Sequence, residues 1–194
     1  MARALNIISK TIVPEIMKPK PAAEANTRLQ IDIGVRTAAW KNVLGDIDAL
    51  CATTLSTAWD FAAPNDGLFE VSVVLTDDAE QRTLNKTYRG KDLSTNVLSF
   101  PAWDVSGPAA PQGVPATLGD IVIAFETVDQ ERSSQGLSWH DHFSHLLVHG
   151  MLHLCGYDHE NTEDAEKMEH LEITILGKLG VGNPYLDDDA PGIG

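Results

Sequence analysis

Three histidines in the C-terminal third of the chain have the spacing of a metal site. His149 and His153 are four residues apart, so on a helix both rings project from one face, one turn apart. Gly156 stands where a glycine can end that helix in the left-handed conformation and turn the chain back, which would bring His159 to the same ion. Three imidazoles leave one tetrahedral position of a zinc ion open for water, as in catalytic zinc sites. We therefore predict one Zn²⁺ per chain at His149, His153 and His159.

Further histidines near this motif leave a second interpretation open, that of a helix that is merely rich in histidine. His145 lies one turn before His149 on the same stripe, and we expect it to pack beside the site or to support a ligand. His140 and His142 are expected to be solvated or near the start of the helix. His170 falls on a later, charged helix and is expected at the surface.

The spacing His-x-x-x-His-x-x-Gly-x-x-His is also that of the metzincin proteases, which carry a glutamate after the first histidine as general base. Here that residue is Gly150. The sequence therefore indicates a different hydrolysis, or a base supplied from elsewhere in the chain. Asp158 is a candidate for a carboxylate that orients a ligand histidine, although a turn-forming role beside Gly156 is the preferred interpretation.

Three segments of the chain resemble the YbeY family of bacterial rRNA maturation factors, which are metal-dependent single-strand endoribonucleases. They occur in the family's order and cover most of the stretch from about Phe69 to Leu179. The segments are HGMLHLCGYDH at 149–159, LNKTYRGKDLSTNVLSFP at 84–101 and LGDIVI at 118–123. The chain departs from the family at Ser94-Thr95-Asn96, where Pro-Thr-Asp is more usual, and this departure touches no predicted metal ligand.

The resemblance implies roles for particular residues. It gives the metal role to His149, His153 and His159 and a functional role to Arg89. A guanidinium pairs two phosphate oxygens at once, so Arg89 suits the charge that develops during phosphodiester hydrolysis. Its alternative is a structural salt bridge to an aspartate, for which Asp92 and Asp120 are the candidates.

The resemblance also implies the activity and its setting. The expected function is hydrolysis of single-stranded RNA in rRNA maturation and ribosome quality control, in the cytoplasm. The partners would be the small ribosomal subunit or its associated proteins, with no DNA and no membrane. Two other classes stay open: a zinc metalloprotease-like hydrolase, and a non-enzymatic ribosome-assembly factor with a structural metal.

The charge of the chain argues against binding RNA by its overall field. With 14 basic and 28 acidic residues the net charge is −14. A local cluster of four cations within ten residues nevertheless predicts a phosphate-binding patch, unless it is only a solvated helix face. The cluster consists of Arg82, Lys86, Arg89 and Lys91, of which all but Arg89 are candidate substrate-binding residues.

The composition is that of an ordinary globular chain. Its 194 residues, 43% hydrophobic, suit one domain with a sizeable core. Two cysteines far apart, Cys51 and Cys155, form no disulfide framework, and Cys155 is expected to be a small buried residue. No apolar run approaches 18 residues, and the first 27 residues lack the apolar stretch of a signal peptide.

The periodicity of apolar residues predicts a single α+β (mixed α/β) domain with about four strands and about five helices. Strands are expected at 29–33, 69–75, 96–100 and 120–125, the second and fourth of them central. Helices are expected at 40–61, from a cap at 77–78 to about 88, and at 126–134, 139–155 and 163–179, with an irregular loop at 105–117. The metal helix should be buried against the sheet and line a cleft. The predicted organisation is a flexible extension over 1–28, the catalytic domain over 29–182 and a loose tail over 183–194.

Overall fold

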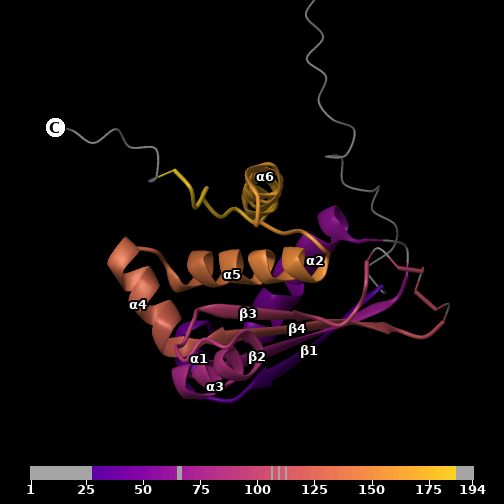
Figure 1. The fold of residues 1–194 in the computed structure, drawn as a ribbon. Helices are drawn as coiled ribbons and strands as arrows, with labels where there is room; N and C mark the ends of the chain where they lie inside the picture. The colour runs from indigo at the N-terminus through magenta and orange to yellow at the C-terminus, as the bar shows by residue number, and fades with distance from the viewer. Residues whose placement is uncertain (1–27, 65–66, 106, 109, 112, 187–194) are drawn as a thin grey trace, which may run out of the picture.

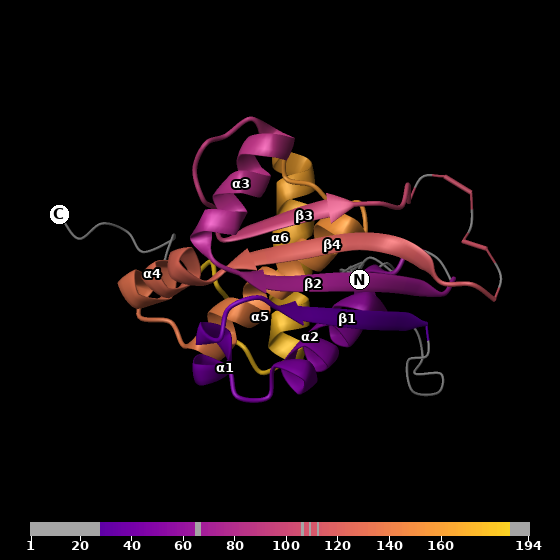
Figure 2. The ribbon, with the colours of Figure 1, turned by 90° about the horizontal axis from the view of Figure 1, so that it is seen from below.

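A four-stranded sheet forms the centre of the structure, a computed structural model that describes residues 28–64, 67–105, 107–108, 110–111 and 113–186. The order of the strands across the sheet is β1-β2-β4-β3. Strands β1, β2 and β4 run parallel, and β3 pairs antiparallel with β4 at one edge (Figure 2). The strands are β1 (Leu29–Val35), β2 (Phe69–Thr76), β3 (Val97–Pro101) and β4 (Ala116–Ala124).

The two strands predicted to be central, β2 and β4, are indeed the inner ones. Seven of the nine residues of β4 are buried, and β2 alternates between buried and more exposed residues. Val71, Val73 and Leu75 of β2 and Ile121 and Ile123 of β4 are at most 1% exposed. The core therefore sits on these strands, as the near-continuous apolar runs predict.

The described residues form six helices. The helices α2 and α5 lie against one face, and α6 crosses α5 on the side away from the sheet (Figure 1). The helix α3 lies beside β3 (Figure 2). The helices are α1 (Ala39–Val43), α2 (Ile47–Ala62), α3 (Asp78–Arg89), α4 (Phe125–Gln135), α5 (Trp139–Leu154) and α6 (Thr162–Lys178).

The helix that carries the histidines, α5, is buried against the sheet as predicted. Ser138 caps it by accepting a hydrogen bond from the backbone N–H of Asp141 at 3.0 Å. At Gly150 the helix comes so close to the sheet that a Cβ atom would stand 2.9 Å from Cγ2 of Ile121 and 3.2 Å from Oγ of Ser99. The Ser99 hydroxyl donates to the Gly150 carbonyl at 3.3 Å. This close approach brings the histidine face of α5 next to the edge strand β3.

Two predicted elements differ from the structure. The helix expected at 40–61 is two helices, because Gly45 adopts a φ of +66° and Asp46 starts α2 by capping Ala49 N–H. The sheet strand expected from Asp120 begins at Ala116, so the loop expected at 105–117 ends earlier. Burial over 116–120 does not alternate strictly, because Leu118 and Gly119 are both buried beside a shift in the register with β2, so the period of two that marks a strand is missing from the sequence.

Both predicted terminal segments fall largely outside the described residues, namely 1–27 of the extension and 187–194 of the tail. Within the described part of the tail, Tyr185 contacts the domain, as shown below. None of the described helices combines the length and apolarity that crossing a membrane would require.

Candidate metal centre

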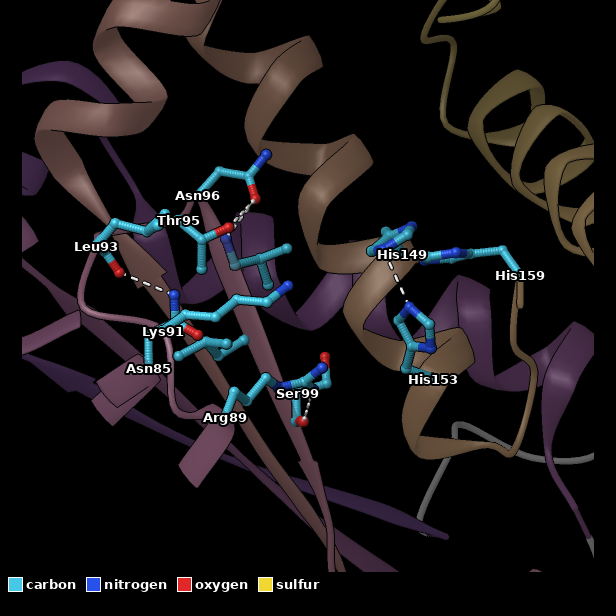
Figure 3. Close-up of a pocket in the computed structure, with 12 residues that line it drawn as sticks. Asn85, Arg89, Lys91, Leu93, Thr95, Asn96, Ser99, His149, His153 and His159 are labelled. Carbon is cyan, nitrogen blue, oxygen red and sulfur yellow. Dashed lines mark hydrogen bonds between the residues drawn. The ribbon is translucent and has the colours of Figure 1, made fainter. Parts of the chain in front are cut away.

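The structure brings the three predicted histidines together. His149 and His153 project from α5, and His159 comes from the turn after it (Figure 3). One ring nitrogen from each lies within 4.8 Å of the others, so the group could hold a metal ion. The ring centroids are 4.6 Å apart for His149 and His153, and 5.1 Å apart for His153 and His159.

The turn that returns His159 is built by the end of α5. Gly156 adopts a φ of +89°. Its N–H bonds the His153 carbonyl at 3.1 Å, and the Tyr157 N–H bonds the Leu152 carbonyl at 3.0 Å, which together form a Schellman motif. A Cβ on Gly156 would also stand 2.4 Å from a methyl group of Val105. The predicted role of this glycine in ending the helix is confirmed.

Hydrogen bonds decide which nitrogens of two histidines carry protons. His149 Nδ1 lies 2.8 Å from Oε1 of Glu172, and His153 Nδ1 lies 3.0 Å from the Tyr157 carbonyl oxygen. A carboxylate and a carbonyl only accept, so each Nδ1 is the protonated donor. Each Nε2 atom is then unprotonated and carries a lone pair, and the two Nε2 atoms lie 3.1 Å apart (Figure 3).

Two lone pairs at that distance cannot hydrogen-bond to each other, whereas a cation between them satisfies both. The surroundings also keep His153 neutral: burial first, then the neighbouring His149 and His159, lower its pKa to about 4. Neutral imidazole is the form that ligates metals. The donor set therefore fits a zinc ion, whose ligands in catalytic sites include three histidines.

A cavity of about 270 Å³ opens beside the histidines. The three rings line one side of it, and the other side is formed by the end of α3, the loop that follows and the free edge of β3 (Figure 3). Arg89 and Lys91 lie in this opposite wall. The expected cleft at the metal helix is present, with two cations across from the histidines.

Arg89 does not form the salt bridge that was its alternative interpretation. Its Nη2 donates to the backbone carbonyl of Ser99 at 3.2 Å, and the structure pairs it with no carboxylate among the described residues. The carboxylate of Asp92 is occupied by two other cations. The Arg89 guanidinium is therefore anchored at one end and exposed towards the cavity.

The predicted basic patch is not one surface. Arg82 Nε and Lys86 Nζ bond the two oxygens of Asp92 at 2.7 and 2.8 Å, and they line a separate depression on α3. Their hydrogen bonds, that of Arg82 first, lower the pKa of Asp92 to about 2. Of the three candidate substrate-binding residues, only Lys91 lines the histidine cavity.

The other histidines do not belong to the three-histidine group, although His145 lies next to it. His140 and His170 are exposed, as predicted. His142 lies near the start of α5, as one of the two expected alternatives has it, but it is not solvated. It is 6% exposed, and its Nε2 lies 3.0 Å from Oε2 of Glu131 on α4. His145 lies beside the group, with Nε2 3.3 Å from Oε2 of Glu172. Cys155 is buried, as expected.

The sequence interpretation missed Glu172. Asp158 accepts a hydrogen bond from the backbone N–H of its neighbour His159 at 2.7 Å, in agreement with the preferred turn-forming role. Glu172 on α6 contacts both His145 and His149. Burial raises its pKa, but the hydrogen bonds from His145 and His149 outweigh this and bring the pKa to about 2. The sequence does contain a signal for a special role of Glu172. This residue interrupts the apolar stripe of α6, four residues after Met168 and three before Ile175.

Comparison with known proteins identifies the class. The family described as Endoribonuclease YbeY matches residues 30–180, so the chain belongs to this family. An "Endoribonuclease YbeY" of Paramagnetospirillum magneticum is 44% identical over 157 residues, which are 81% of this chain and 96% of the relative. Another, of Nitrobacter winogradskyi, is 46% identical over 146 residues, covering 75% of this chain and 76% of the relative.

Among solved structures, the solution structure of a Thermotoga maritima protein is similar with a TM-score of 0.48 and 22% identity. The match covers 86% of this chain and 99% of that one.

Proposed function

We propose that this chain is a metal-dependent endoribonuclease that hydrolyses phosphodiester bonds of single-stranded RNA. The domain over 29–182 carries the site, flanked by segments 1–28 and 183–194. One Zn²⁺ is held by His149, His153 and His159. The observation that carries the proposal is the pair of Nε2 lone pairs facing each other at 3.1 Å beside a cavity with two cations in its far wall. The relatives named endoribonucleases support the same activity.

In this proposal, the residues on the two sides of the cavity have different roles. When bound, zinc supplies a Lewis acid for a phosphoryl oxygen and lowers the pKa of a water molecule towards 7. Arg89, tethered to the Ser99 carbonyl, pairs with the phosphate oxygens on which negative charge develops. Lys91 lies in the same wall and binds a neighbouring phosphate as a point charge.

The packing of α5 disfavours the alternative of a metalloprotease of metzincin type. The general base of those enzymes would stand at position 150, where a Cβ atom alone would already lie 2.9 Å from Ile121 and 3.2 Å from Ser99. A glutamate has no room there unless α5 moves away from the sheet. The third class, an assembly factor with a structural metal, is disfavoured by the open cavity and by the exposure of His159, because structural zinc sites are closed.

The proposal extends to the setting implied by the sequence motifs. The substrate is rRNA during maturation and ribosome quality control in the cytoplasm. The small ribosomal subunit or its proteins present the strand. A recessed site reaches the phosphates of a flexible strand more easily than those of an A-form duplex. With few free cations at the cavity, partners rather than the overall field select the cleavage site.

The test combines elemental analysis with cleavage of a single-stranded RNA by the full chain, with and without chelator. We expect one zinc per chain, and loss of both zinc and cleavage in His149→Ala. His170→Ala, which removes an exposed histidine on α6, is the matched control and should retain both. A protein that holds zinc but cuts no RNA would favour the assembly-factor class, and cleavage of casein would favour the protease.

A further inference from the structure

The buried carboxylate of Glu172 reaches the metal centre from a different helix. It lies on α6, which crosses α5, and it is 0% exposed. Three side chains contact it: His149 Nδ1 at 2.8 Å from Oε1, His145 Nε2 at 3.3 Å from Oε2, and the hydroxyl of Tyr185, which donates to Oε2. The carboxylate is therefore held on both oxygens, one of which serves His149 alone.

Packing does not call for a carboxylate at this position. The buried face of α6 is otherwise apolar, with Met168, Ile175 and Leu176. A buried carboxylate is costly unless it is hydrogen-bonded, so an apolar residue of similar size would fit this face at lower cost. An apolar residue could not reproduce the hydrogen bonds to His149, His145 and Tyr185, and of these three residues only His149 belongs to the three-histidine group.

We infer that Glu172 is a positioning residue, which keeps His149 protonated on Nδ1 so that the lone pair of Nε2 points to the metal. His145 and Tyr185 keep the Glu172 carboxylate in place by occupying its other oxygen. This inference rests on the proposed function only in that the three-histidine group binds a metal.

The three histidines differ in the group that hydrogen-bonds to each ring. This difference makes the contact between Glu172 and His149 testable. His153 is held by a backbone carbonyl, that of Tyr157, which no substitution removes. The ring of His159 is hydrogen-bonded to none of the described residues. His149 is held by a side chain, so Glu172→Gln alters the orientation of one ligand and leaves the others unchanged.

The first measurement is the tautomer of His149 in the metal-free full chain, from long-range ¹H–¹⁵N spectra. We expect the Nδ1–H form. In Glu172→Gln the amide can either accept from Nδ1 or donate to it, so we expect signals of the Nε2–H form. Glu166→Gln changes the same charge at an exposed position of α6 and should leave the wild-type spectrum. An Nε2–H tautomer in the wild type would overturn the inference, and this measurement needs no variant to fold.

The second measurement is zinc affinity by competition with a chromophoric chelator at pH 7.5. We expect Glu172→Gln to weaken binding by about 10–100-fold, with Glu166→Gln unchanged. Tyr185→Phe should weaken it less, because the bond from His149 remains. Equal affinity of Glu172→Gln and the wild type would overturn the inference. Neither measurement uses RNA, so a chain with these results that cuts no RNA would refute the proposed nuclease activity alone.

Discussion

The contact between α5 and the sheet at Gly150 leads to a prediction with a defined sign. A methyl group at this position would lie 2.9 Å from Cγ2 and 3.3 Å from Cδ1 of Ile121, and 3.2 Å from Oγ of Ser99. The first distance is too short for any stable contact. Ile121 is fully buried in the central strand β4 and cannot turn away, so α5 must shift by a few tenths of an ångström. We therefore expect Gly150→Ala to be destabilising.

The magnitude follows from two opposing effects. Overpacking of a filled core costs about 1–3 kcal/mol. Replacing glycine by alanine inside a helix gains about 1 kcal/mol, so the net destabilisation is about 0–2 kcal/mol. Gly177 of α6 is the matched control, because a Cβ there would meet nothing within 4 Å. Gly177→Ala keeps the gain without the clash, so the difference between the two variants is the overpacking cost itself, about 1–3 kcal/mol.

Urea unfolding of both variants measures this difference, with the change in Tm as a check at about 2–4 °C per kcal/mol for a chain of this size. The substitution Gly150→Ala should also affect zinc binding and RNA cleavage differently. His149 and His153 move together with α5, so zinc affinity should change little in Gly150→Ala. RNA cleavage should fall, because the histidines move relative to Arg89 across the cavity. If Gly150→Ala stabilises the chain as much as Gly177→Ala does, the close approach is not real and the argument against a glutamate at this position fails.

Three other predictions concern the cavity and the cysteines. Arg89→Ala should lower kcat by about 10²–10³ while zinc content and Tm stay near wild type, because only one hydrogen bond to Ser99 is lost. Arg89→Lys should restore cleavage only in part, and a large loss of Tm in Arg89→Ala would mean a structural role. Single-stranded RNA should bind better than duplex. If Arg89 and Lys91 are the contacts, the logarithm of the binding constant should fall with the logarithm of the salt concentration with a slope of about −1.4, and a slope near −10 would refute this. Burial raises the pKa of Cys51 and Cys155 to about 12, so neither thiol should react with a thiol reagent at pH 8 until the chain unfolds, and rapid labelling of the native chain would contradict this.

Local patterns account for the part of the site that could be predicted. The spacing of His149 and His153 and the glycine at 156 place three rings in one region because helix geometry and a Schellman turn act over ten residues. Glu172 is 23 residues from His149 and reaches it only because α6 crosses α5. No periodicity in the sequence encodes that crossing. The interrupted apolar stripe of α6 indicates a carboxylate with a special environment, but it does not identify the partner.

The basic cluster shows a different limit of sequence reasoning. Four cations within ten residues suggest one phosphate-binding surface, yet Asp92 sits among them and its two oxygens bind Arg82 and Lys86. Exposed ion pairs of this kind are weak, so RNA could compete for these two side chains. They nevertheless lie at a separate depression, while Arg89 and Lys91 line the histidine cavity. Whether a helical cation faces a cavity depends on the rotation of α3 against β3, which tertiary packing determines.

The net charge of −14 becomes consistent with an RNA substrate once the cations are assigned in this way. Among the described residues, Arg89 and Lys91 are the cations that line the cavity, and they can neutralise two phosphates at most, while the acidic surface repels RNA elsewhere. Such a chain should bind free RNA weakly and without preference for sequence. We therefore expect productive cleavage to require another molecule that holds the strand at the cavity. In this view the acidic surface raises selectivity, because RNA that no partner presents is kept away from the site.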